Sequence, residues 1–113
     1  MLTIRKAQLD ALTADLLVQY KDRLLRQFTS AYPVQFSRLQ EEGMRALIER
    51  GVDTAIQYHI ETERDVAAFI TLALRTTGDI ETMIQRESVR RILEDDTLAG
   101  EFKVQLIQLQ LNK

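Results

Sequence analysis

One helix ends and the next begins within Tyr58-His59-Ile60-Glu61-Thr62-Glu63-Arg64-Asp65. Thr62 is suited to be an N-cap, and Asp65, three residues later, can return the hydrogen bond as in a capping box. Glu63 and Asp65 also place negative charge in a first turn, where the helix dipole favours it. The apolar residues that follow predict a buried, central helix that continues to about Arg75.

The helix before this stretch is predicted from about Glu41 to Tyr58. His59, the only histidine, follows its end, where a residue with positive φ often sits, and histidine is among the few non-glycine residues enriched there. A single histidine without cysteine or clustered carboxylates is also a poor metal site, so we expect a structural role. Gly51 lies on the apolar side of this helix and predicts close approach of another helix backbone.

A long amphipathic helix is predicted from about Arg5 to Ala31, with a break near Thr13 into a short helix and a longer one as the alternative. Its apolar stripe follows steps of three and four residues and comprises Leu9, Leu12, Leu16, Tyr20, Leu24 and Phe28. Pro33 ends this helix, because the residue before a proline is pushed out of the α region. Residues 34–40 are expected to form a connector anchored by Phe36 and Leu39.

After the central helix, Gly78 is predicted as a C-cap, followed by a helix from Met83 to Glu94 and a last helix from Leu98 to Leu111. The last helix is expected to place Phe102, Leu106 and Leu109 inward. Its apolar residues point to more than one side, however, so one face is also available to another chain. The candidate partner-binding residues are Phe102, Leu106, Ile107, Leu109 and Leu111.

Composition supports one domain over residues 1–113, an all-α, compact bundle of about five helices with a long N-terminal amphipathic helix. Of the 113 residues, 45% are hydrophobic and 28% charged, as in folded globular proteins, and four Gly and one Pro are too few for a turn-rich sheet fold. Cysteine is absent, and no apolar run approaches a signal peptide or a membrane helix. We therefore expect a cytoplasmic protein without membrane contact.

Chemistry-bearing patterns are weak. The serines lack a nucleophile-elbow context, the glycines are scattered singly, and the carboxylate clusters sit at helix ends, where capping and solvation explain them. We expect no enzymatic activity, no cofactor and no metal. The net charge is −2, divided into +3 over residues 1–40 and −5 over residues 41–113, so no nucleic acid partner is expected either. Another protein is the expected partner, and a homodimer is an option.

Two stretches carry a family resemblance: Gln8-Leu9-Asp10-Ala11-Leu12, and a run comprising Gly51-Val52, Ala55, Tyr58, Ile60 and Thr62-Glu63-Arg64-Asp65-Val66. They resemble a family of small bacterial proteins encoded beside type VI secretion spike proteins and effector chaperones. In that family the first stretch leads to an amphipathic helix ending near a proline, here Pro33. The resemblance implies a co-chaperone-like accessory protein that binds the chaperone loading a toxin onto the spike.

Two departures from the family pattern stand out. His59 occupies a position where the family usually has Gly, which agrees with a positive φ. The family often has Phe-Asp and then Pro-Trp-Ala after the central helix, whereas residues 78–91 read GDIETMIQRESVRR without tryptophan. If that segment contacts the partner, this chain binds a different one.

Three functions remain open from the sequence. The first is a protein-binding accessory factor of type VI secretion, which binds an effector chaperone or effector. The second is an immunity protein, which would present a surface such as the acidic residues 94–101 to a toxin. The third is a DNA-binding regulator with a helix-turn-helix in residues 41–75, which the carboxylates Glu61, Glu63 and Asp65 oppose through repulsion of phosphate.

Overall fold

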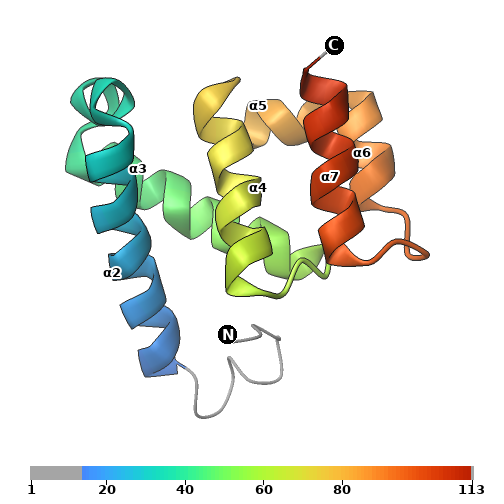
Figure 1. Cartoon of the computed structure of the whole chain (residues 1–113), viewed down its shortest axis with the longest axis horizontal. Helices are drawn as coiled ribbons and strands as arrows, with labels where there is room; N and C mark the ends of the chain where they lie inside the picture. Colours follow the sequence, from blue (N-terminus) through green and yellow to red (C-terminus); the bar gives the residue numbers. More distant parts are fainter. Residues whose placement is uncertain (1–13, 113) are drawn as a thin grey trace.

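Helix α4 (Glu63–Arg75) lies at the centre of the fold in a computed structural model that describes residues 14–112 (Figure 1). It begins as predicted, because Thr62 Oγ1 accepts a hydrogen bond from the Asp65 amide at 3.1 Å. The side chains that make it the most buried helix have no exposed surface; they are Val66, Phe69, Ile70 and Ala73. The prediction of a buried central helix is confirmed.

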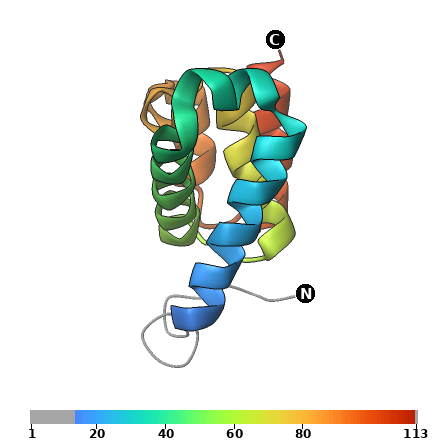
Figure 2. The same ribbon diagram turned by 90° about the vertical axis from the view of Figure 1, so that its left-hand side faces the viewer.

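Five more helices surround α4 within the described residues: α2 (Ala14–Ala31), α3 (Pro33–Gln57), α5 (Ile80–Gln85), α6 (Glu87–Leu93) and α7 (Gly100–Leu111). The predicted all-α fold class is confirmed. Helices α2 and α3 pack side by side, and α6 and α7 pack together on the other side of α4 (Figures 1 and 2). None of these six helices is long and apolar enough to cross a membrane.

Helix α2 uses the predicted apolar stripe in its later turns. Tyr20, Leu24 and Phe28 are at most 4% exposed, and the Tyr20 hydroxyl donates a hydrogen bond to the Glu63 carbonyl oxygen at 2.6 Å. The stripe was extended too far, however: Leu16 is 44% exposed, because the first turns of α2 project beyond α3 and α4 (Figure 2). The part of the predicted helix at residues 5–13, including the resemblance at residues 8–12, lies outside the described residues.

The predicted connector at residues 34–40 is wrong, because most of it is helical. Pro33 does end α2 at Ala31, but it also occupies the first turn of α3, where a proline costs no hydrogen bond. Helix α3 is then kinked at Gln40, whose backbone has φ 63° and ψ 175°. Phe36 and Leu39 pack against the core as predicted. The kink turns the short first part of α3 away from the long second part, which matches the predicted helix from Glu41.

The two glycines singled out by the sequence have different roles. Gly78 has φ 77°, and its amide donates a hydrogen bond to the Ala73 carbonyl at 2.6 Å, as expected at the end of a helix. The prediction for Gly51 needs correction, because side chains rather than a helix backbone approach it. A Cβ at Gly51 would lie 2.5 Å from Ile70 Cγ1 and 3.3 Å from Ile80 Cδ1.

The single helix predicted from Met83 to Glu94 is also wrong. It is divided between α5 and α6, and Arg86 between them is extended, with φ −63° and ψ 128°. Ile80 in α5 and Val89 in α6 are both fully buried. They are nine residues apart, which is two and a half turns at about 3.6 residues per turn, so a straight helix would point them in opposite directions. The break lets both reach the core.

Candidate functional site

Helix α7 begins in tight contact with the turn that ends α3. A Cβ on Gly100 would lie 2.8 Å from the His59 carbonyl oxygen and 3.0 Å from Ile60 Cα. Both neighbours are backbone atoms, which cannot move aside as a flexible side chain can. Gly100 therefore permits a closeness that no other residue would, and it fixes where α7 meets the turn.

The buried side chain of Lys103 holds α7 in place a turn later. Only 1% of Lys103 is exposed, and its ammonium donates hydrogen bonds to the carbonyl oxygens of Tyr58 at 2.9 Å and Leu93 at 2.8 Å. These carbonyls end α3 and α6, where the negative ends of helix dipoles favour a cation. Burial lowers the pKa of Lys103, and the nearby charges of Asp96 and Asp95 oppose that shift.

The remaining inward face of α7 corrects the prediction for Ile107. Val104 and Ile107 face the core, with exposures of 6% and 0%, so Ile107 cannot serve as the partner-binding residue it was predicted to be. Leu111 is only partly buried and packs against the core. The apolar residues of α7 occur on two sides, so hydrophobicity alone does not determine which side faces the core. The contacts of Lys103 and Gly100 determine it, and neither residue was singled out in the sequence.

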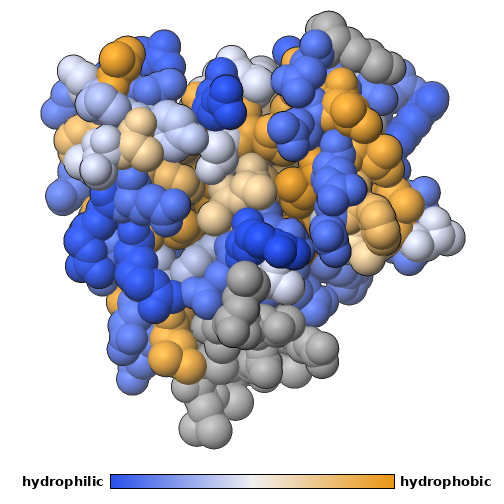
Figure 3. Space-filling view, viewed as in Figure 1, coloured by the Kyte–Doolittle hydropathy of each residue, from blue (hydrophilic) through white to orange (hydrophobic). Residues whose placement is uncertain are grey.

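Phe102, Leu106 and Leu109 therefore face outward instead of inward. They are 54%, 36% and 60% exposed, and we call these three residues the α7 stripe. Their spacing of four and three residues places them on one side of the helix. Figure 3 shows hydrophobic surface along α7. Three of the five predicted partner-binding residues are thus brought together on one accessible face.

Charged groups lie beside the two ends of the α7 stripe. At the start of α7, Glu101 is 4.0 Å from Arg64 of α4, and Glu94 and Asp96 are exposed in the preceding residues. At the other end, Arg75 lines a shallow groove of about 220 Å³ with Leu72, Thr76, Gln108 and Asn112. The face between these ends carries uncharged glutamines, so acidic groups outnumber Arg64 at one end of the stripe and Arg75 lies at the other.

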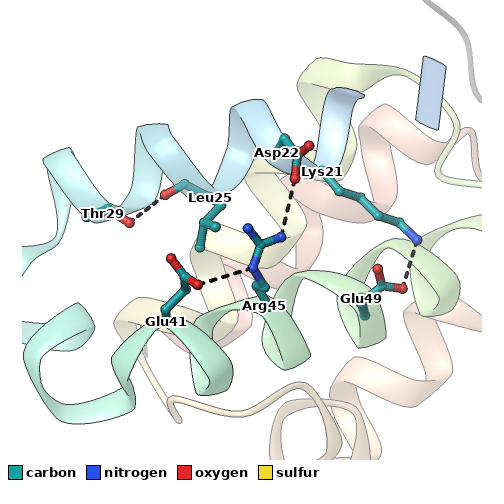
Figure 4. A network of polar contacts seen from close by, with 7 residues as sticks. All are labelled: Lys21, Asp22, Leu25, Thr29, Glu41, Arg45 and Glu49. Atoms are coloured by element: carbon teal, nitrogen blue, oxygen red, sulfur yellow. Dashed lines mark hydrogen bonds and ion pairs between the residues drawn. The ribbon is translucent and has the colours of Figure 1, made fainter. Parts of the chain in front are cut away.

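Ion pairs occupy much of the basic surface of α2. Lys21 Nζ lies 2.8 Å from Glu49, and Arg45 Nη1 of α3 lies 3.3 Å from Asp22, as Figure 4 shows. Arg23 pairs with Glu63 of α4. On α6, Arg91 pairs with Glu87 at 2.6 Å. These pairs join helices or follow one helix turn, so structural roles account for a good part of the basic residues.

His59 occupies the position that the sequence predicted. Its φ is 64°, which confirms the expectation of a positive φ after a helix end. The side chain is 70% exposed, and its Nδ1 lies 3.8 Å from Glu61. Its carbonyl is the group that Gly100 approaches, so the backbone of His59 contributes more to the architecture than its imidazole does.

No protein-family model, curated protein or solved structure matches this chain. Across residues 14–112, no group of three or more His, Asp or Glu side chains is arranged to hold a metal ion. Of the five residues that the sequence proposed for partner binding, three are exposed on one helix face, and these three form the α7 stripe. We therefore take it as the candidate functional site.

Proposed function

We propose that this chain is a non-enzymatic accessory protein that binds another protein through the α7 stripe. The observation that carries this proposal is the outward position of Phe102, Leu106 and Leu109, three large apolar side chains on one helix face. Exposed aromatic and aliphatic side chains grouped on a rigid element are typical of the centre of a protein interface. Lys103 and Gly100 make α7 such an element, because they fix it to the ends of α3 and α6.

The sequence resemblance supports a more specific setting for this binding. It suggests a cytoplasmic factor of bacterial type VI secretion whose partner is an effector chaperone or an effector of the same locus. The stripe suits a partner helix or groove with apolar residues, which is a common mode of recognition between helical proteins.

Co-purification tests this proposal. The tagged chain would be expressed with each protein encoded beside it, as wild type, as Leu109→Glu and as Val34→Glu. Val34 is 77% exposed on α3 and provides a matched control, since it also exchanges an exposed apolar side chain for a charge. We expect one neighbour to be retained by the wild type and by Val34→Glu and lost with Leu109→Glu. Failure to retain any product of the locus would refute the proposal.

A second candidate function is an immunity protein that blocks a toxin directly. The exposed side chains of Glu94, Asp96 and Glu101 favour it, because they form an acidic edge beside the stripe. A growth-rescue assay against the adjacent toxin separates the two functions. Protection by the chain alone supports immunity, whereas an accessory factor that binds a chaperone gives no protection.

A further inference from the structure

We propose that, when no partner is bound, two copies of this chain associate through the α7 stripe, with their α7 helices antiparallel about a two-fold axis. This inference goes beyond the proposed function, and it rests on the geometry and charges of α7 and α4 alone. Phe102, Leu106 and Leu109 follow the four-and-three spacing of a helix-pairing seam. A pairing that brings the two Leu106 side chains together places Phe102 of each copy opposite Leu109 of the other.

The flanks of the stripe do not oppose this pairing. Gln105, Gln108 and Gln110 are the polar residues along it, and none carries a charge that would repel its counterpart in a second copy. Charged residues at such flanking positions normally decide which helices pair. Because these flanks are neutral, the pairing of two copies and its direction depend on the apolar seam and on the charges at its two ends.

Those end charges select the antiparallel direction. Glu101 lies at the start of α7 and Arg75 lies near its end, on the same side of the helix, because α4 and α7 run alongside each other in the same direction (Figure 1). A two-fold axis perpendicular to α7 keeps that side in common and brings Glu101 of one copy to the level of Arg75 of the other. A parallel pairing would instead place the two Glu101 residues at the same end but on opposite sides of the seam, so that neither would meet Arg75 of the other copy.

The size of the stripe sets the strength of the association. A stable dimer buries about 800 Å² on each partner, more than three half-exposed side chains supply. We therefore expect a weak dimer, with a dissociation constant between about 10 µM and 1 mM. Such a dimer shields the apolar side chains at high concentration and yields to a partner with a larger contact surface.

Sedimentation equilibrium of the whole purified chain, from about 10 µM to 1 mM, tests the proposal. Leu109→Glu is expected to raise the dissociation constant at least about tenfold, and Phe102→Glu to do the same, whereas Val34→Glu leaves it unchanged. Circular dichroism of each variant checks that the helices remain. A wild type that stays monomeric throughout, or a Leu109→Glu variant that dimerises like the wild type, overturns the proposal.

Charge reversal tests the direction of pairing. Glu101→Arg and Arg75→Glu should each weaken the dimer, and the double variant should restore it in part, because the pair between copies is re-formed with exchanged signs while Arg64 repels the new arginine of its own chain. A double variant as weak as the sum of the single ones overturns the antiparallel arrangement. These results are independent of co-purification: a monomeric chain that still retains its partner refutes this inference and leaves the proposed function standing.

Discussion

Replacing Lys103 with methionine tests what holds α7 in position. Methionine keeps most of the volume and the helix propensity of lysine but removes the ammonium group. The carbonyl oxygens of Tyr58 and Leu93 then lose the donors that now lie 2.9 Å and 2.8 Å away. The bond to Leu93 is buried, so water cannot replace its donor without opening the contact between α6 and α7, whereas the bond to Tyr58 is only partly buried.

The magnitude follows from two opposing contributions. A buried acceptor left without a donor costs about 1–3 kcal/mol, which applies in full to the Leu93 carbonyl and in part to the partly buried Tyr58 carbonyl. Methionine also removes the cost of burying a charge, which the lowered pKa of Lys103 reveals. The helix dipoles and the nearby Asp95 and Asp96 offset part of that cost in the wild type. We expect a net loss of about 2 kcal/mol in the free energy of unfolding.

Urea unfolding followed by circular dichroism measures this loss, since a domain of this size usually unfolds in one step. Lys21→Met is the matched control: Lys21 pairs with Glu49, whose side chain is 59% exposed, and such a pair contributes at most about 1 kcal/mol. The reasoning is refuted if Lys103→Met is as stable as the wild type, or no less stable than Lys21→Met.

The pH dependence provides a second readout of the same residue. Its folded-state pKa is lowered, so between that value and the unfolded value of about 10.4 the unfolded chain binds more protons. Stability contributed at this residue therefore rises as the pH increases through that window. Lys103→Met should remove the rise, and an unchanged slope would show that the ammonium is not desolvated as the structure indicates.

Three further changes test other parts of the fold. Gln40→Gly should raise the free energy of unfolding measured in urea by about 1 kcal/mol, because the backbone at φ 63° and ψ 175° suits glycine. Gln35→Gly is the control: it lies within the helical first part of α3 and should lower the free energy of unfolding by a similar amount. Gly100→Ala should lower the unfolding free energy by about 1–3 kcal/mol, because its Cβ would lie 2.8 Å from the His59 carbonyl; a neutral effect would show that α7 can shift freely. Burial raises the pKa of Tyr20, so above about pH 10 the unfolded chain loses the phenol proton before the folded chain does, and the free energy of unfolding falls. Urea titrations at rising pH should show this fall in the wild type and not in Tyr20→Phe.

Sequence reasoning succeeded where a signal and its effect lie within a few residues. The Thr62 cap, the positive φ of His59 and the turn at Gly78 depend on hydrogen bonds and backbone preferences within one helix end. The central helix was predicted for a similar reason, because its apolar residues cover more than one side and leave burial as the only outcome.

The errors arose where tertiary packing decides. The break at Arg86 is needed to bury both Ile80 and Val89, and nothing within residues 83–94 specifies where the core lies. The kink at Gln40 similarly depends on how α2 folds back on α3. No local pattern predicts a glutamine with a positive φ.

In the candidate site too, the local features were predictable from the sequence and the orientation of the helix was not. The sequence predicted that α7 is apolar on two sides and that one side could contact another chain. It placed Phe102, Leu106 and Leu109 inward because periodicity alone could not orient the helix. The orientation depends on Lys103 reaching two carbonyls that are 45 and 10 residues away in the chain. The available signal was the single lysine among the apolar and glutamine residues of 102–111.

The most direct test of the central claim is a binding titration between this chain and the effector chaperone that we propose as its partner. Isothermal titration calorimetry would compare the wild type, Leu109→Glu and Val34→Glu, each first shown by circular dichroism to keep its helices. The α7 stripe predicts that Leu109→Glu weakens binding at least about tenfold while Val34→Glu binds like the wild type. Equal affinity for all three proteins, or no binding by the wild type, would contradict the claim that α7 presents the contact surface.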